Sequence, residues 1–334
     1  MDPVTHGLIG ATASQSFAGK EKLRAAAFTG FVSAMTADLD IFISDSSDPL
    51  LNLEIHRQFT HSLVFIPFGA LIAAALVWWF VRKRLSFKET YLFSLAAYAT
   101  AGIADTFTSY GVQLLWPFVD ERYALNIISV FDPLFTLGIV ITSGIVFYKR
   151  QRILSWMAWS WMILYLLFGS AQKQRAASIA DQIALHKNHI HRQVVVKPTI
   201  ANQLLWSIRY QARDKIHAYG VRLSPFSETI IYKGEAAPLL DWRKEYASYK
   251  GTTLYEDIQR FSDLSEGYLI HHPQKDQVIG DGRYAMLPTS TSPLWGIEID
   301  TTRPNQHVQF KTYRDAGPEI RDSFLDMLLG RKLK

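Results

Sequence analysis

Residues 62–81 form a run of 20 positions, SLVFIPFGALIAAALVWWFV, that contains no charged side chain. A helix of about twenty apolar residues is long enough to cross the hydrocarbon core of a bilayer. The run therefore predicts a membrane span and excludes a simple soluble globule. The opening segment, MDPVTHGLIG, has no lysine or arginine before Lys20. A cleaved signal peptide needs a basic first region, so we expect this segment to be retained.

Further apolar runs extend the membrane interpretation over the first half of the chain. We expect helices at about residues 25–43, 63–81, 91–116, 127–148 and 153–171. Residues 3–18 are a sixth candidate, short and rich in small side chains that suit packing against other helices. Five or six helices would thus build an α-helical integral membrane domain over residues 1–171.

Basic residues between these runs predict the orientation of the chain. With six spans, ten of the twelve Lys and Arg of residues 1–171 fall on one side, at Lys20, Lys22, Arg24, Arg82, Lys83, Arg84, Lys88, Lys149, Arg150 and Arg152. The positive-inside rule makes that side cytoplasmic. We therefore expect an integral protein of the cytoplasmic (inner) membrane whose C-terminal domain is extracytoplasmic. The same orientation holds if residues 3–18 lie on the cytoplasmic surface.

The formal charge of +5 belongs to the second half of the chain, where 23 Lys and Arg face 18 Asp and Glu, against 12 of each in residues 1–171. On a membrane protein such an excess indicates basic residues that meet anionic lipid. No basic run with interleaved aromatic residues is present, so we expect no nucleic-acid partner.

The C-terminal part has the pattern of a small extramembrane α+β domain at residues 193–334, joined by a juxtamembrane helix or linker at 172–192. We expect helical stretches near residues 238–263 and 318–329. The expected short strands are VVVK, LLWSIRYQ, ETIIYKG, GYLIHH, RYAML and HVQFKT.

Ionisable residues in or beside the apolar runs give the main functional signal. Such groups cost several kcal/mol at membrane depth unless they are paired, hydrated or bound to metal. With six spans they converge on the outer membrane boundary, and they are His6, Asp38, Asp40, His56, Arg57, His61, Asp105 and Asp132. The chain has no cysteine, so a metal would be held by His, Asp or Glu.

Two observations leave the use of these residues open. Asp38 and Asp40 are two positions apart, which on a continuous α-helix directs them about 200° away from each other. Both can serve one site only if the helix changes its conformation there. In addition, a buried aspartate in a membrane protein is often the structural partner of an arginine, a role that Arg57 could fill.

Five strings of the sequence, in order, closely resemble the YdjM-like family of membrane-bound metal-dependent hydrolases. They are MDPVTHGLIG, DLD, HRQFTHS, ADTFTSYGVQLLWPF and NIISVFDPLFTL, and the resemblance is strong over about residues 1–150. The later stretch NQLLWSIRY is similar to the extramembrane domain of longer members. The hydrolase description of the family reflects a distant similarity to zinc-dependent phospholipase C.

The resemblance implies the metal ligands or their immediate neighbours, with Asp132 as a further site residue. The implied ligands are His6, Asp38, Asp40, His56, His61 and Asp105. Many members have a histidine where this chain has Ala101, so we expect one or two divalent ions, zinc or alternatively manganese, instead of three.

A site of this kind fits hydrolysis of a phosphoester by a metal-bound hydroxide, because zinc lowers the pKa of bound water to about 7. Asp38 or Asp40 would bridge metals or act as base, and Arg57 would neutralise an anionic substrate oxygen. Thr60, Ser109 and Asn126 would orient the ligands. A site at the membrane boundary favours a substrate from the lipid phase, such as a phospholipid or another lipid-linked phosphate.

Two other classes of function remain open at this stage. One is a non-catalytic membrane protein that uses the His and Asp cluster to bind a cation or a partner. The other is a transporter in which Asp105 and Asp132 relay protons. The oligomeric state has no signature in the sequence.

Overall fold

The computed structural model describes residues 1–224 and 227–333, which divide into two compact units. The helical unit contains residues 1–43, 55–171 and 200–202. The C-terminal unit contains residues 44–54, 172–199 and the described residues from 203 onward. The loop 44–54 therefore belongs to the C-terminal unit, although the chain on both sides of it belongs to the helical unit.

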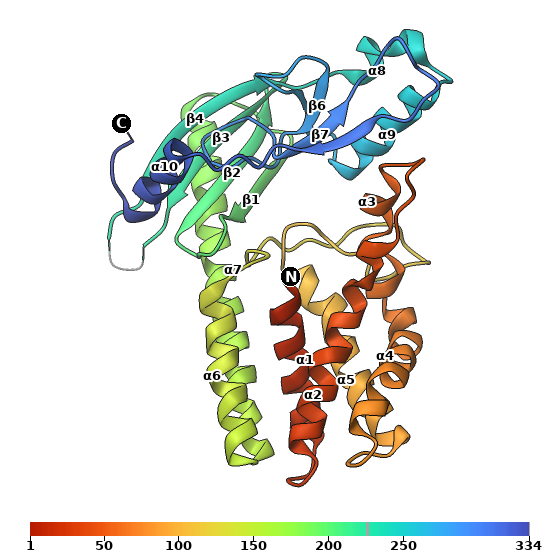
Figure 1. Cartoon of the computed structure of the whole chain (residues 1–334). Coiled ribbons are helices and arrows are strands. Elements are labelled where there is room, and N and C mark those ends of the chain that lie inside the picture. Colours follow the sequence, from red (N-terminus) through yellow and green to blue (C-terminus); the bar gives the residue numbers. More distant parts are fainter. Residues whose placement is uncertain (225–226, 334) are drawn as a thin grey trace. The chain divides into compact units, whose positions relative to one another are not determined.

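The helical unit places its long helices side by side (Figure 1). Its elements are α1 (Pro3–Phe17), α2 (Leu23–Met35), the 3₁₀ helix η1 (Thr36–Phe42), η2 (Phe59–His61), η3 (Leu63–Phe65), α4 (Ile66–Val81), α5 (Phe87–Thr106), α6 (Pro133–Lys149), η4 (Arg152–Leu154) and the first half of α7 (Ser155–His186).

Three helical segments are long and apolar enough to cross a membrane, namely Leu23–Phe42, Leu63–Val81 and Arg152–His186. Helix α6 is apolar but has only 17 residues. Helix α5 has 20 residues, carries Lys88, Glu89 and Asp105, and is not among these three segments. The structure thus supports a membrane domain with at least three spans, and a total of five or six stays a prediction.

Two predicted helices differ in extent from the structure. Helix α5 ends at Thr106 instead of 116, and α6 begins at Pro133 instead of 127. The side chain of Asp132 accepts a hydrogen bond from the Phe135 backbone and so caps α6. Between the two helices the backbone pairs irregularly, for example from Leu125 N to the Thr106 carbonyl at 2.6 Å.

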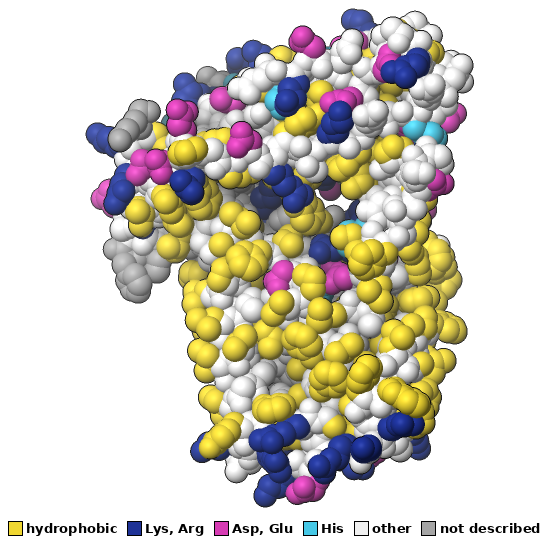
Figure 2. All heavy atoms as spheres, viewed as in Figure 1, with side chains coloured by type: hydrophobic (Ala, Val, Ile, Leu, Met, Phe, Trp, Pro, Cys, Tyr) yellow, Lys and Arg dark blue, Asp and Glu magenta, His cyan; other side chains and the backbone are white. Residues whose placement is uncertain are grey.

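Small residues allow close packing of helices in the helical unit, and its basic side chains gather at one end. A Cβ added to Gly30 in α2 would lie 2.3 Å from the carbonyl oxygen of Gly10 in α1, so these helices approach at backbone contact. Lys and Arg side chains gather at one end of the helical unit, and hydrophobic side chains cover most of the face in view (Figure 2). This surface is the one expected of a helix bundle in lipid.

The C-terminal unit contains two antiparallel four-stranded sheets with consecutive strand order, in agreement with the α+β prediction. The first sheet is β1 (Val194–Pro198), β2 (Leu205–Ala212), β3 (Lys215–Arg222) and β4 (Ile230–Pro238), and the second is β5 (Leu269–His271), β6 (Val278–Asp281), β7 (Trp295–Glu298) and β8 (Gln309–Thr312). Helices α3 (Leu51–Ile55), α8 (Trp242–Glu245), η5 (Ala247–Tyr249), α9 (Thr253–Leu264) and α10 (Pro318–Leu329) complete the described elements.

The strand prediction was wrong at one segment and incomplete at three. The expected strand RYAML (residues 283–287) has no strand conformation in the structure. Its first side chain, Arg283, forms ion pairs with Asp281 and Glu266. Strands β3, β6 and β7 were not predicted. In β6 and β7 a glycine interrupts the alternation of apolar and polar residues.

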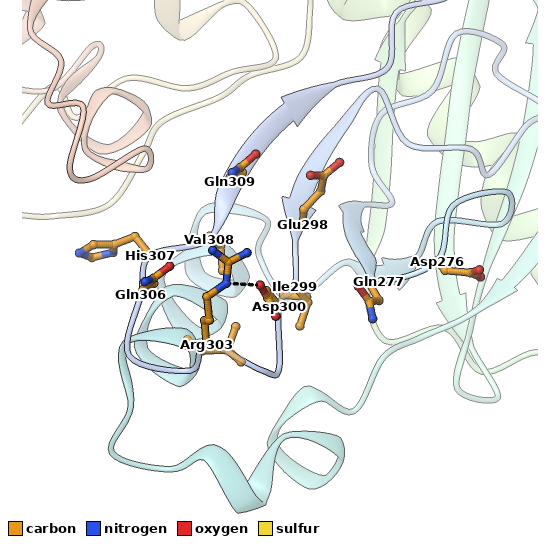
Figure 3. A pocket seen from close by; sticks show the side chains of 11 residues that line it. Asp276, Gln277, Glu298, Ile299, Asp300, Arg303, Gln306, His307, Val308 and Gln309 are labelled. Carbon is orange, nitrogen blue, oxygen red and sulfur yellow. Dashed lines mark hydrogen bonds and ion pairs between the residues drawn. The ribbon is translucent and has the colours of Figure 1, made fainter.

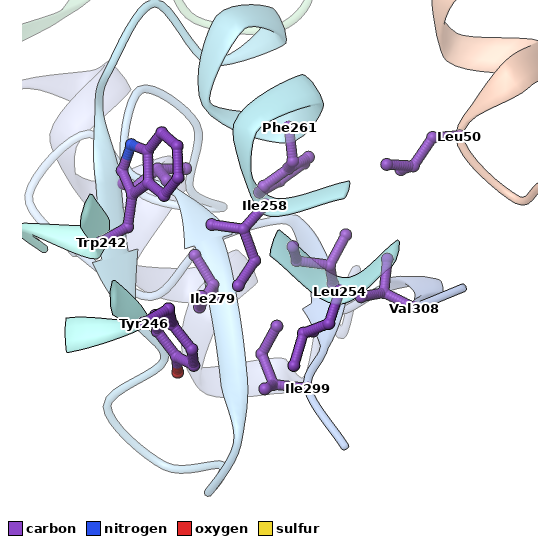
Figure 4. Close-up of a cluster of buried hydrophobic side chains, with 11 residues drawn as sticks. Leu50, Trp242, Tyr246, Leu254, Ile258, Phe261, Ile279, Ile299 and Val308 are labelled. Carbon is purple, nitrogen blue, oxygen red and sulfur yellow. The ribbon is translucent and has the colours of Figure 1, made fainter. Parts of the chain in front are cut away.

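Leu50, from the loop 44–54, is fully buried in the main core of the C-terminal unit (Figure 4). It joins side chains of α9 such as Ile258 and Phe261. On the same helix Arg260 lies 2.9 Å from an Asp48 oxygen and 2.7 Å from a Glu54 oxygen. An apolar anchor and an arginine bridge thus hold the loop 44–54 against α9.

Candidate metal centre

Four ionisable residues from four separate segments of the helical unit converge in the structure. They are His6 on α1, Asp38 on η1, His61 on η2 and Asp105 on the last turn of α5. One nitrogen or carboxylate oxygen from each lies within 4.8 Å of the corresponding atom of every other. Three of these side chains have no exposed surface, and that of Asp38 is 15% exposed. The cluster is therefore enclosed, with Asp38 as its accessible member.

The conformation of η1 explains how Asp38 and Asp40 serve one region. After Met35 the chain tightens from α to 3₁₀, and residues two apart then differ by about 120° around the axis. Both carboxylates consequently flank His61. Asp38 Oδ1 lies 3.4 Å from its Nε2, and Asp40 Oδ2 lies 3.6 Å from its Nδ1. The expected change in helix conformation thus occurs.

Asp40 lies beside the four-residue cluster and organises the chain that carries His61. Its Oδ2 accepts hydrogen bonds from the Thr60 hydroxyl at 2.5 Å and from the Arg57 backbone at 2.9 Å. Its Oδ1 lies 2.7 Å from His56 Nδ1. Asp40 and His56 are not part of the four-residue group whose ligand atoms lie within 4.8 Å of one another, and their role as ligands stays a prediction.

Arg57 places a buried cation against the cluster. Its Nε lies 2.9 Å from Asp105 Oδ2, without the geometry of a hydrogen bond. The backbone of Arg57 has φ +62°, a left-handed conformation that an arginine rarely adopts. The Met1 amine also contacts Asp105, through Oδ1. Asp105 is therefore partly neutralised by fixed positive charge within the protein.

The donor atoms of the cluster fit a divalent metal ion. His61 Nε2, His6 Nδ1 and one oxygen each of Asp38 and Asp105 are buried without a hydrogen-bond partner. Buried polar atoms are normally satisfied, and unsatisfied ones at a cluster of ligand types point to an absent ion or water. Imidazole nitrogens and carboxylate oxygens are the ligands that suit zinc and manganese.

Two residues at the cluster were not identified from the sequence. The hydroxyl of Tyr98 donates to the Thr60 carbonyl at 2.9 Å. A Cβ added to Gly102 would lie 2.1 Å from the His61 carbonyl oxygen, so only glycine permits this approach. Both lie on α5 at helical spacing toward Asp105, and that shared face of α5 was a signal available in the sequence.

Asp132 and Asn126 lie outside the cluster. Asp132 caps α6, and its oxygens accept hydrogen bonds from the Tyr165 hydroxyl at 2.8 and 2.9 Å. The Asn126 side chain donates to the carbonyl of Ala124. Asp132 was expected at the site, but in the structure its contacts are those of a helix cap.

The C-terminal unit has a separate polar pocket of about 410 Å³ (Figure 3). Its acidic lining is largely neutralised internally, since Asp300 pairs with Arg303 at 2.7 Å and Glu298 with Lys311 at 2.6 Å. None of the site residues predicted from the sequence lines this pocket. The pocket therefore gives no argument about the metal cluster.

Comparison with known proteins supports the membrane interpretation. A profile of the family described as YdjM inner membrane protein matches residues 1–176, which confirms the family suggested by the sequence motifs. The chain is 35% identical over 78 residues to YfhP of Bacillus subtilis (strain 168), covering 23% of this chain and 24% of that protein. The chain thus spans about a quarter of the length of this relative.

A second relative matches over most of its own length. The chain is 31% identical over 148 residues to the inner membrane protein YbcI of Escherichia coli (strain K12), covering 42% of this chain and 80% of that protein. No solved structure matches.

Proposed function

Because the chain belongs to the YdjM inner membrane protein family, we propose that its buried cluster holds a divalent metal ion and that the protein is a membrane-embedded metal-dependent hydrolase. The observation that carries the proposal is the meeting of His6, Asp38, His61 and Asp105 from four segments, where each side chain has one buried nitrogen or oxygen without a hydrogen-bond partner. Burying such atoms without an ion would leave several unsatisfied groups in a low-dielectric environment.

The four residues supply two imidazoles and two carboxylates, a set whose charge matches that of one divalent ion. Asp40 and Thr60 act as positioning residues, because they fix the segment that carries His61. A bound zinc ion would supply Lewis-acid polarisation and a lowered pKa of water. Arg57, beside Asp105, is the group best placed to neutralise an anionic oxygen of the substrate.

A phosphoester of a lipid or lipid-linked molecule is the substrate class that the surroundings favour. Asp38 is the accessible ligand, and its neighbours Leu39, Ile41 and Phe42 are 48%, 55% and 79% exposed. Large exposed apolar side chains on a membrane helix contact acyl chains. A substrate that reaches Asp38 along this surface would arrive from the bilayer.

The proposed orientation follows from the basic loops. These loops, at residues 20–24, 82–88 and 149–152, follow the ends of α1, α4 and α6 that lie away from the cluster. With this end in the cytoplasm, the cluster faces outward. Helix α7 begins at Ser155 and has 32 residues, a length of about 48 Å that would carry the chain to the extracytoplasmic side.

The test is elemental analysis of the full chain in detergent, compared with His61→Gln and Asp38→Asn. We expect one divalent ion per chain, lost in both variants and retained in the control Asp45→Asn, an exposed acid of the loop 44–54. The loaded protein is then assayed against a panel of lipid phosphoesters. Stoichiometric metal binding without cleavage of any phosphoester would refute the hydrolase, and protein that stays metal-free after reconstitution would refute the centre.

One observation favours a second candidate, a non-catalytic membrane protein that uses the cluster for cation or partner binding. The Arg57 guanidinium is already paired with Asp105 at 2.9 Å, so within the protein it is committed to a structural contact instead of a substrate oxygen. This candidate predicts metal binding without turnover. Replacement of Arg57 by glutamine would then strengthen metal binding, whereas in the hydrolase it would abolish cleavage.

A further inference from the structure

Two basic side chains of the C-terminal unit are buried on one face of the first sheet. Lys197 on β1 pairs with Ser207, and Arg209 follows two positions later on β2. Side chains two apart on a strand share a face, so Lys197 and Arg209 are diagonal neighbours. Lys197 is 8% exposed and Arg209 is 1% exposed. The opposite face carries Trp206 and Ile208, which pack against alanines of α7.

Neither cation has an anionic partner among the described residues. The Lys197 ammonium makes no hydrogen bond and lies over the Tyr284 ring, 2.9 Å from its centroid. Arg209 Nη2 donates to the Ser290 carbonyl at 2.6 Å, but its Nε and Nη1 have no partner. The hydroxyl of Tyr268 is also buried without a partner.

The nearby carboxylate of Asp281 already accepts hydrogen bonds from another arginine. Asp281 accepts hydrogen bonds from Arg283 through the backbone, Nε and Nη2, at 2.8 to 3.2 Å. Arg283 is itself 9% exposed and also pairs with Glu266 at 2.7 Å. Three buried basic side chains thus lie around the Asp281 carboxylate, which is saturated by Arg283 alone, and Glu235 acts on Arg209 only from a distance.

This imbalance is energetically unfavourable as it stands. Burial lowers the pKa of Arg209 to about 10, which still leaves the guanidinium charged at neutral pH. Burial also holds the pKa of Lys197 well below its usual range, with Asp281 opposing the shift. An uncompensated buried charge costs several kcal/mol, whereas a bound anion would restore the pairing and satisfy the free N–H groups.

We propose that Lys197 and Arg209, on the inner face of the first sheet, bind a phosphate group. Tetrahedral oxyanions accept many hydrogen bonds, and the donors left free on Lys197 and Arg209 are an ammonium and two guanidinium nitrogens. Enclosure among side chains at least nine-tenths buried would strengthen each contact. The phosphate would come either from solution or from a phosphomonoester lipid headgroup.

The test is equilibrium dialysis of the full chain in detergent against radiolabelled inorganic phosphate, with EDTA present and phosphate-free buffer as the start. We expect one phosphate per chain. Lys197→Met should weaken binding at least about tenfold, the value of one lost hydrogen bond between charged groups. The control Lys215→Met, at an exposed position of β3, should bind as the wild type does.

Further arms identify the source and separate this site from the metal cluster. The variant His61→Gln should still bind phosphate, so failure of the metal proposal leaves this one intact. Displacement by micelles that contain phosphatidic acid would indicate a headgroup, and displacement by inorganic phosphate alone would indicate the free ion. Absence of saturable binding by the wild type, or equal loss in Lys215→Met, would overturn the proposal whether or not Lys197→Met folds.

Discussion

Thr60 connects the cluster to the residues that support it, and its replacement gives the sharpest test of the proposed centre. The hydroxyl donates to Asp40 at 2.5 Å and lies 3.0 Å from His61 Nδ1, while the Thr60 carbonyl accepts from Tyr98. Thr60→Val removes the hydroxyl and nearly preserves the shape. It does not remove a proposed ligand, so its effect on metal binding reports orientation alone.

The magnitude follows from the lost hydrogen bond. A buried hydrogen bond to a charged group contributes about 1.5–3 kcal/mol, which equals about a 10- to 150-fold change in an equilibrium constant. Removing an orienting partner of a metal ligand costs about 10- to 100-fold in affinity. We therefore expect the zinc affinity of Thr60→Val to fall about 10- to 100-fold.

The assay is competition with a chromophoric chelator, on detergent-purified protein of confirmed fold. Thr60→Ser keeps the hydroxyl and should bind zinc within about threefold of the wild type, a difference below 1 kcal/mol. A Thr60→Val protein with unchanged affinity would refute the role of Asp40 and Thr60 in positioning His61. Equal weakening in Thr60→Ser would show that packing of the methyl group matters instead.

Three further outcomes are expected. Gly102→Ala should reduce bound metal in elemental analysis, because its Cβ would meet the His61 carbonyl at 2.1 Å, whereas Gly144→Ala, in open space, should not. Asp132→Asn should leave metal content unchanged, since Asp132 caps α6, and a loss of metal would contradict this assignment. Leu50→Ala should destabilise the C-terminal unit by about 2–5 kcal/mol, seen as a lower thermal midpoint, and an unchanged midpoint would contradict its place in the core.

The sequence predicted correctly those helices whose residue pattern is itself typical of a helix. The uncharged run at 62–81 became η3 and α4, and residues 318–329 became α10. The early end of α5 was not predicted, because the segment after Thr106 is apolar enough to continue a helix. Its backbone instead pairs irregularly with residues 123–128, which no local pattern reveals.

In the candidate site, too, some features were predicted from the sequence and others depend on contacts between distant residues. The residue types of the cluster were predicted, and His6, Asp38, His61 and Asp105 do converge. The difference between Asp38 and Asp40 depends on the 3₁₀ turn of η1 and on the left-handed backbone at Arg57, which are set by tertiary contacts. Asp132 was named as a further site residue through the family resemblance, and its roles as the cap of α6 and as the acceptor for the Tyr165 hydroxyl were not predicted from the sequence.

The loop 44–54 determines where the chain can be truncated for experiments on the helical unit. It leaves the helical unit just after Asp40, contributes Leu50 to the C-terminal core, and returns just before His56. A protein truncated at residue 171 would keep every residue of the cluster but would lose the packing partners of Leu50 and the arginine that bridges Asp48 and Glu54. Such a fragment would not be a minimal form of the proposed metal centre, because the loop that joins Asp40 to His56 would lose the contacts that hold it in place.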